Sequence, residues 1–253
     1  MTYGTGLPFA VGRAQRRRKT AKSSVYSSER IISPPLLGKL PGLEFNERLA
    51  MDGITLLKKI PVECVPVVFF DPQYRGILDK QSYGNEGKSR GQQRCSLSQM
   101  TEEVIREFIA EIGRVLIPSG HLFLWMDKFH LCTGFGGWIE GTGLCTVDMI
   151  TWNKKRIGMG YRTRRCSEHL VVLQKAPRRA KGVWKRHDIP DVWDERVDRS
   201  NGVHPKPIEL QARLIEAVSN PQDLVVDPAA GSFSVLEACR YIGRNFLGCD
   251  LNG

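Results

Sequence analysis

The chain has 253 residues, of which 41% are hydrophobic and 25% charged, and this is the composition of one large folded domain. No apolar run approaches the ~18 residues of a membrane-spanning helix, and there is no secretory signal, so we expect a cytoplasmic protein and no membrane protein. The seven cysteines form no CxxC pair, which argues against a disulfide framework and against a metal site. The formal charge of +10 predicts a polyanionic partner.

The basic charge is regional. Residues 1–35 are rich in Ser, Arg and Lys and have no apolar period, which predicts a flexible basic arm before a folded domain over residues 36–253. Residues 151–187 carry twelve Lys or Arg side chains and a single acid, Glu168. Both regions suit contacts with phosphates, and the alternative for both is a solvated charged surface.

The first half of the domain combines buried strands with a long loop. A short strand precedes a helix over roughly residues 52–60, and the apolar run at residues 65–70 suits a strand of a parallel sheet covered on both faces. Residues 75–98 predict a mobile loop, of the kind that often binds ligands. A helix begins near Thr101, and a strand follows at residues 121–127. The apolar face of that helix consists of Val104, Ile105, Phe108, Ile109 and Ile112.

The second half ends in a clear strand–helix–strand unit. Strands are expected at residues 144–154 and 167–175, whereas residues 176–203 show no regular pattern. A helix begins at Pro207. Further along lie a strand at 223–227, a glycine turn at 228–232, a helix at 233–243 and a strand at 245–250. These elements predict an α/β fold, with a mostly parallel sheet and helices on both faces.

Acids follow three of the predicted strands, where open α/β sheets bind their ligands: Asp71, Asp227 and Asp250. A glycine turn with an acid about twenty residues further on is typical of a nucleotide site, and Asp250 lies 250 − 227 = 23 residues after Asp227. Because the turn has one glycine, Gly231, it is a poor cradle for pyrophosphate. A nucleoside such as S-adenosylmethionine fits better than NAD, and an ordinary strand–helix connection is the alternative.

Four motifs, in this order, carry a resemblance to a known family. "NERLAMDGITLL" (46–57) is followed by "DPQY" (71–74), "HPKP" (204–207) and "DPAAGSFSV" (227–235). Together they resemble the S-adenosylmethionine-dependent amino-methyltransferases of DNA, over the range from Glu44 to Asp250. The catalytic motif precedes the cofactor turn, as in the beta class, which implies a circularly permuted, Rossmann-like methyltransferase fold. Gln73 replaces the usual proline, and Ala229 and Phe233 replace an aromatic residue and a second glycine.

The resemblance implies a role for each motif residue. The Asp71 carboxylate and the Pro72 carbonyl would accept hydrogen bonds from the amino group of a flipped base, and Tyr74 would stack on that base. Asp250 would bind the ribose hydroxyls of S-adenosylmethionine. Other cofactor contacts are implied for the turn residues Asp227, Pro228, Ala229 and Gly231, for Lys206 and Pro207 near the methionine carboxylate, and for Asp52 near the adenosine. For Asp52 a simple helix N-cap is the alternative.

Basic side chains in two segments would contact the phosphates of double-stranded DNA. The candidates are Arg162, Arg164, Arg165, Arg178, Arg179, Lys181, Lys185 and Arg186. Trp184 and Trp193 are candidates for stacking or wedging, although packing is the commoner role of a tryptophan. Residues 176–203 are short for a target-recognition region, so we expect specificity to be shared with residues 75–98 or with a second subunit of a homodimer.

The motif favours adenine N6 as the methylated amine, since Asp71 replaces the serine that is commoner in cytosine-N4 enzymes. The predicted activity is sequence-specific methylation of DNA in the cytoplasm, at the nucleoid, as part of restriction-modification. Cytosine N4, or a base in RNA, is the alternative substrate. From another class, a non-catalytic subunit that binds DNA is the alternative, and Gln73 would then mark a decayed motif.

Overall fold

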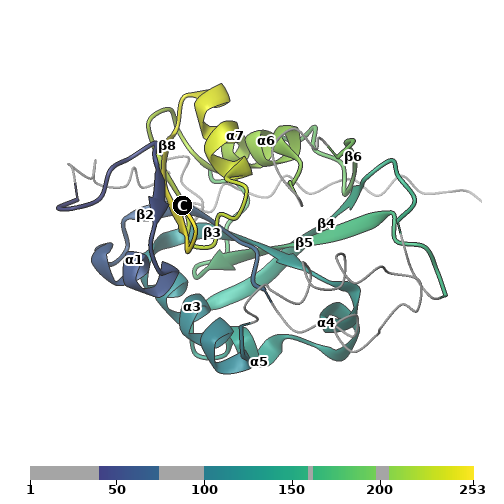
Figure 1. Cartoon of the computed structure of the whole chain (residues 1–253), viewed down its shortest axis with the longest axis horizontal. Coiled ribbons are helices and arrows are strands. Elements are labelled where there is room, and N and C mark those ends of the chain that lie inside the picture. Colours follow the sequence, from purple (N-terminus) through teal and green to yellow (C-terminus); the bar gives the residue numbers. More distant parts are fainter. Residues whose placement is uncertain (1–39, 74–99, 159–161, 198–204) are drawn as a thin grey trace, which may run out of the picture.

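The computed structural model describes residues 40–73, 100–158, 162–197 and 205–253. In these residues the chain forms an eight-stranded sheet with the order β1-β8-β7-β2-β3-β5-β4-β6 (Figure 1). Neighbouring strands are parallel except that β5 runs antiparallel to β3 and β4. The strands are β1 (Arg48–Ala50), β2 (Val65–Phe70), β3 (Leu116–Met126), β4 (Leu144–Asn153), β5 (Ser167–Lys175), β6 (Val192–Asp194), β7 (Leu224–Asp227) and β8 (Asn245–Asp250).

Helices cover the sheet on both faces, as predicted (Figure 1). One face carries α1 (Gly53–Lys59), α3 (Glu102–Val115) and α5 (Gly136–Ile139), and the other carries α6 (Ile208–Val218) and α7 (Ser234–Ile242). The short helix α4 (Lys128–Thr133) follows β3. Within β2, Val68 and Phe70 belong to the core on the α1–α3 side, and Val67 and Phe69 to the core on the α6–α7 side. This double burial explains the unbroken apolar run of the strand.

The structure confirms most predicted elements and corrects three details. β3 begins at Leu116, directly after α3, and pairs there with Val65 before the register shifts. The strand predicted at residues 121–127 therefore begins five residues earlier, with an irregularity at Ser119, which has φ of 63°. Val104 is 37% exposed and does not belong to the buried face of α3. β6 lies within residues 176–203 and pairs with β4, although its three residues were too few to give a pattern.

Strand register brings the predicted acids to one edge of the sheet, which we call the carboxyl edge. Phe70 pairs with Leu124, and Asp227 with Gly248, so Asp71 follows a strand that ends there, and Asp227 and Asp250 are the last residues of two others. Lys175 lies at the opposite, amino edge, where its Nζ donates to the Leu116 carbonyl at 2.7 Å. No helix in the described ranges is long and apolar enough to cross a membrane.

Candidate active site

The cofactor turn follows β7 and faces open space at its glycine. Gly231 has φ of +51°, and a Cβ added there would meet no atom within 4 Å. The Ala230 amide donates to the Cys249 carbonyl at 2.9 Å, which fastens the turn to β8. Phe233, which replaces a glycine of the family pattern, is 1% exposed and packs edge-on against Phe246. The departure at Phe233 therefore fills the core and leaves the turn open.

Helix α1 lies directly against this turn. A Cβ on Gly53 would meet the Pro228 carbonyl oxygen at 2.1 Å, so the residue after Asp52 must be glycine for this approach. The Asp52 carboxylate accepts a hydrogen bond from the Thr55 amide at 2.7 Å and is the N-cap of α1. Asp52 thus has the capping role that the sequence offered as an alternative, at a position beside the turn. Its contact with adenosine stays a prediction.

Three carboxylates gather at the carboxyl edge. Asp227 is 6% exposed and accepts a hydrogen bond from the Ala229 amide at 3.2 Å. Burial raises the pKa of Asp227 to about 8, and the negative charges of Asp71 and Asp250 contribute in the same direction. The Asp250 carboxylate is partly exposed and accepts from the Asn252 amide at 3.0 Å. A ligand that carries positive charge would be stabilised here.

The raised pKa of Asp227 gives a stability prediction. An acid whose pKa is higher in the folded chain than in the unfolded chain favours folding at low pH, and that contribution is lost as pH rises from about 4 to about 8. Asp227→Asn keeps the acceptor for the Ala229 amide but cannot ionise. We expect the variant to have a higher Tm than the wild type at pH 8 and the same Tm below pH 4, in thermal melts across this range. An equal difference in Tm between the variant and the wild type at every pH would contradict the raised pKa of Asp227.

Lys206 links the catalytic motif to the rest of the edge. Its Nζ lies 2.9 Å from Asp71 Oδ2 and 2.8 Å from Glu168 Oε2, and 4.8 Å from the centre of the Trp125 ring. Lys154 also pairs with Glu168. Burial lowers the pKa of Lys206, but the charges of Asp71 and Glu168 outweigh burial and raise it above its usual value. The ammonium therefore stays charged at physiological pH.

The start of α6, just after Lys206, is held in place by Glu195. The first amides of α6, those of Glu209 and Leu210, each donate to the Glu195 carboxylate at 3.0 Å. Glu195 is anchored in turn, because its carbonyl accepts the Trp152 indole N–H at 2.7 Å. A cavity of about 110 Å³ lies beside Lys206 and has Trp152, Glu195 and Pro207 in its lining. Pro207 lines this cavity, and its contact with the cofactor stays a prediction.

The catalytic motif also anchors the ends of the predicted loop. Asp71 is partly exposed, whereas Pro72 is buried. The Gln73 carbonyl accepts the Met100 amide at 2.7 Å, so the chain leaves and re-enters the described fold at one point beside Asp71. Gln73 thus contributes through its backbone, which any residue supplies. Tyr74 and the loop over residues 75–98 lie outside the described residues, as does the arm over residues 1–35.

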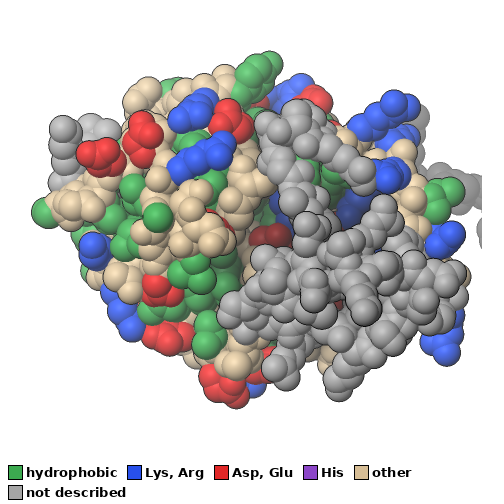
Figure 2. All heavy atoms as spheres, viewed as in Figure 1, with side chains coloured by type: hydrophobic (Ala, Val, Ile, Leu, Met, Phe, Trp, Pro, Cys, Tyr) green, Lys and Arg blue, Asp and Glu red, His purple; other side chains and the backbone are tan. Residues whose placement is uncertain are grey.

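The two basic segments lie at opposite edges of the sheet. Arg162, Arg164 and Arg165 belong to the connection between β4 and β5 at the carboxyl edge, since His169 pairs with Met126 near the end of β3. Arg162 and Arg164 are exposed, and the Arg165 guanidinium lies 6.0 Å from the centre of the Phe129 ring. In Figure 2, the charged side chains visible at the end of the molecule that carries this connection are Lys and Arg, whereas basic and acidic side chains are mixed elsewhere.

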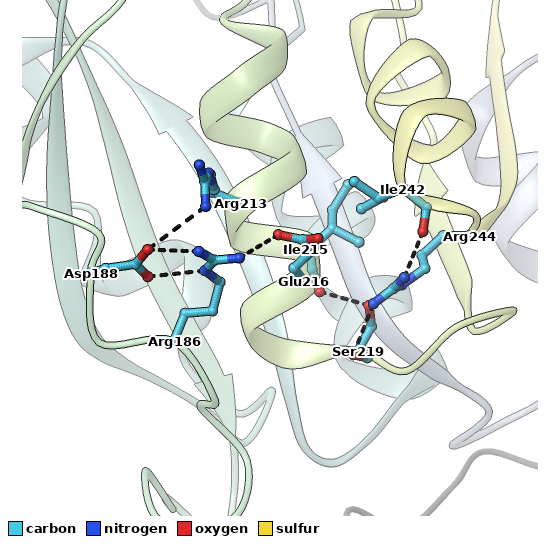
Figure 3. Close-up of polar contacts among 8 residues, drawn as sticks. All are labelled: Arg186, Asp188, Arg213, Ile215, Glu216, Ser219, Ile242 and Arg244. Carbon is cyan, nitrogen blue, oxygen red and sulfur yellow. Dashed lines mark hydrogen bonds and ion pairs between the residues drawn. The ribbon is translucent and has the colours of Figure 1, made fainter.

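The second segment follows Lys175 at the amino edge, away from Asp71. Lys185 Nζ donates to the Ser219 carbonyl at 2.8 Å and to Asn220 at 2.6 Å. Arg186 forms ion pairs with Asp188 at 2.6 Å and Glu216 at 2.7 Å (Figure 3). Both side chains hold this segment to the C-terminal end of α6, and their contact with phosphates stays a prediction. The other basic candidates of this segment are Arg178 and Lys181, which are exposed, and Arg179, which is half-buried.

The two tryptophans of this region pack against the fold. Trp184 contacts the core on the α6–α7 side and lies edge-on to His121, with ring centres 5.8 Å apart. Trp193 packs against the same core, and its indole donates to the Glu195 carboxylate at 2.8 Å. Both therefore have the commoner role that the sequence offered. In the described part of the chain, no group of three or more His, Cys, Asp or Glu side chains could hold a metal ion.

Comparisons with known proteins identify the family of the chain. Residues 65–253 match the family model described as DNA methylase. The chain is 56% identical over 207 residues to the Type II methyltransferase M.HhaII of Haemophilus parahaemolyticus, which covers 81% of this chain and 91% of that protein. It is 48% identical over 255 residues to the Type II methyltransferase M1.MboII of Moraxella bovis, covering 83% and 93%.

Solved structures share the fold. The complex of M1.HpyAVI with SAM matches with a TM-score of 0.58 and 17% identity, over 81% of this chain and 92% of that one. The PvuII DNA methyltransferase, described as cytosine-N4-specific, matches with a TM-score of 0.58 and 16% identity, over 83% of each chain. The fold is that of a Rossmann-like methyltransferase. The chain belongs to the DNA methylase family, the S-adenosylmethionine-dependent amino-methyltransferases that its motifs predicted.

Proposed function

We propose that this protein methylates the N6 amino group of adenine at a specific sequence in double-stranded DNA. The observation that carries the proposal is the Asp71 carboxylate, fixed by Lys206 at the carboxyl edge that also holds Asp227 and Asp250. Asp71 begins the DPQY motif, and an aspartate there favours adenine over cytosine. The likeness to relatives named Type II methyltransferases supports a part in restriction-modification.

The residues of the site fit S-adenosylmethionine, which supplies the methyl group. The Gly231 turn offers open backbone, and Asp250 is a partly exposed acceptor of the kind that binds ribose hydroxyls. Asp250 brings a partly exposed carboxylate to this edge, and a cationic ligand beside the buried Asp227 would favour its ionised form, so the edge suits a ligand with sulfonium and ammonium charges. Asp227, Pro228, Ala229 and Gly231 would form its binding turn. Further contacts would come from Asp52 and Pro207.

The amino group of adenine is a weak nucleophile, because its lone pair is delocalised into the ring. With the base flipped out of the duplex, the Asp71 carboxylate and the Pro72 carbonyl each accept one amino hydrogen, which favours a pyramidal nitrogen with a directed lone pair. The nitrogen forms a bond to the methyl carbon as the carbon–sulfur bond breaks, and the nitrogen then loses one proton to solvent. Tyr74 would stack on the base. Positioning supplies much of the rate.

The experiment that tests this function is modified-base sequencing of genomic DNA from a methylation-free host that expresses the protein. N6-methyladenine at one recurring sequence is the expected result. N4-methylcytosine would replace the adenine assignment. Cofactor binding without a modified base in DNA or RNA would identify a non-catalytic subunit and overturn the proposal.

We place the DNA phosphates at the carboxyl edge, against Arg162, Arg164 and Arg165, because a flipped base must enter beside Asp71. Changing these three arginines to Ala is expected to weaken binding to all DNA sequences and to flatten the plot of log affinity against log salt by about 0.9 per lost contact. The matched variant changes Arg178, Arg179 and Lys181 at the amino edge to Ala. Fluorescence anisotropy at several salt concentrations measures both.

The expected slope of the amino-edge variant is closer to that of the wild type. If both triple variants had slopes flatter than that of the wild type by the same amount, DNA would contact both edges, as the sequence alone suggested. If neither slope changed, the phosphate contacts would have to lie in other basic side chains.

A further inference from the structure

Lys206 has three partners that come from three different strands. Asp71 follows β2, Glu168 lies in β5 and Trp125 lies in β3. The side chain of Lys206 is 16% exposed, and those of Asp71 and Glu168 are 37% and 33% exposed. The ammonium is therefore enclosed on several sides, by two charge-assisted bonds and an aromatic face.

Glu168 is held independently of Lys206. Lys154, at the end of β4, pairs with the other oxygen of its carboxylate. The pKa of Glu168 is lowered because the charges of Lys206 and Lys154 outweigh the effect of burial. The alternating chain Asp71, Lys206, Glu168, Lys154 thus balances two negative with two positive charges and connects β2 to the β4–β5 pair.

We propose that Lys206 is a positioning residue for the Asp71 carboxylate, and that Glu168 acts on catalysis by holding Lys206 in place. The proposal rests on the proposed role of Asp71 as the acceptor of the amino hydrogens. It assigns Lys206 a role toward the base, whereas the resemblance implied a contact with the methionine carboxylate. Glu168 receives a role that no motif of the sequence suggested.

Geometry and local charge both make Asp71 dependent on Lys206. An acceptor directs a lone pair only if its own orientation is fixed, and a misplacement of about 1 Å can lower a rate by about 100-fold. Asp71 also shares the carboxyl edge with Asp227 and Asp250. Lys154, the other cation of the chain Asp71, Lys206, Glu168, Lys154, pairs with Glu168. Removal of Lys206 would leave Asp71 without this cation on an edge that also carries Asp250, and neighbouring negative charge disfavours an ionised carboxylate.

The experiment compares Lys206→Met, Lys206→Arg, Glu168→Gln and the double variant Glu168→Gln/Lys206→Met. Each is assayed for kcat at saturating DNA and cofactor, for the cofactor Kd by calorimetry, and for the pH profile of kcat. Glu107→Gln is the matched control, because Glu107 pairs with Lys58 at the same 2.8 Å but is 50% exposed between α1 and α3. Circular dichroism and thermal melts establish that each variant is folded.

Lys206→Met is expected to lower kcat by about 100-fold, to change the cofactor Kd by less than about threefold, and to move the acid limb of the profile to higher pH. Lys206→Arg keeps the charge, so its kcat should be at least about tenfold higher than that of Lys206→Met. Glu168→Gln alone should lower kcat by about tenfold, but added to Lys206→Met it should change kcat by less than about twofold, because residues that act through one another are not additive.

The proposal is overturned if Lys206→Met raises the cofactor Kd by tenfold or more while kcat at saturation stays unchanged, which would assign Lys206 to the cofactor. It also fails if Glu168→Gln lowers kcat by the same factor in the Lys206→Met variant as in the wild type. That result would show that Glu168 acts independently of Lys206. Should Lys206→Met not fold, the Lys206→Arg and Glu168→Gln results decide. An active Asp71→Asn variant would instead contradict the proposed function itself.

Discussion

Asp71→Asn is expected to lower kcat for methyl transfer by about 100- to 1,000-fold, the loss typical of removing one preorganised group that stabilises developing charge. The amide has the shape of the carboxylate but only one acceptor oxygen and no charge, so it cannot polarise the amino group as strongly. The cofactor Kd should stay within about twofold of the wild-type value, because the proposed partner of the carboxylate is the base and not the cofactor. Single-turnover transfer of a labelled methyl group measures the rate, and calorimetry measures the Kd.

Asp148→Asn is the matched control for this prediction, since Asp148 lies exposed on β4 and its carboxylate accepts a hydrogen bond from the adjacent Met149 amide. It should keep the wild-type rate. A cofactor Kd that rises in parallel with the loss of rate in Asp71→Asn would place Asp71 in the cofactor site and remove it from the base site.

Asp250→Ala is expected to raise the cofactor Kd by about 10- to 100-fold, because a hydrogen bond to a charged acceptor contributes roughly 1.5–3 kcal/mol. Binding of DNA in the absence of cofactor should not change, since Asp250 lies at the end of β8, four strands away from β5 in the sheet order. Asp250→Asn keeps one acceptor and should lose less affinity. Calorimetric affinities of the two variants that match the wild type would exclude Asp250 from the ribose contact.

The sequence predicted those parts of the site that are local along the chain. The DPQY motif and the Gly231 turn each follow a buried strand directly, so strand and functional residues appear in one short stretch. The βαβ unit over residues 223–250 was clear for the same reason: β7, α7 and β8 agree with the predicted ranges to within a residue.

The parts that the sequence did not predict depend on strand register. Glu168 reaches Lys206 because β5 runs antiparallel beside β3 and places His169 opposite Met126. The same antiparallel strand carries the chain from the carboxyl edge to the amino edge, which separates Arg165 from Arg178 although only the strand lies between them. A lone acid in a basic stretch was the available signal for Glu168. Its partner, Lys206, is thirty-eight residues away in sequence.

The pairing of β1 with β8 has a consequence for how the molecule is made. Arg48 is the register partner of Gly248, and Asn46 Nδ2 donates to Asn245 at 3.3 Å, across 199 residues of chain. During synthesis, β2, α3 and β3 are complete long before β8 emerges from the ribosome, so the strand that precedes Asp71 can form early. The edge that carries Asp250 must wait for this most distant pairing, and contacts of such sequence separation form slowly. A nascent chain would therefore acquire its ability to bind the methyl donor as the last step of folding.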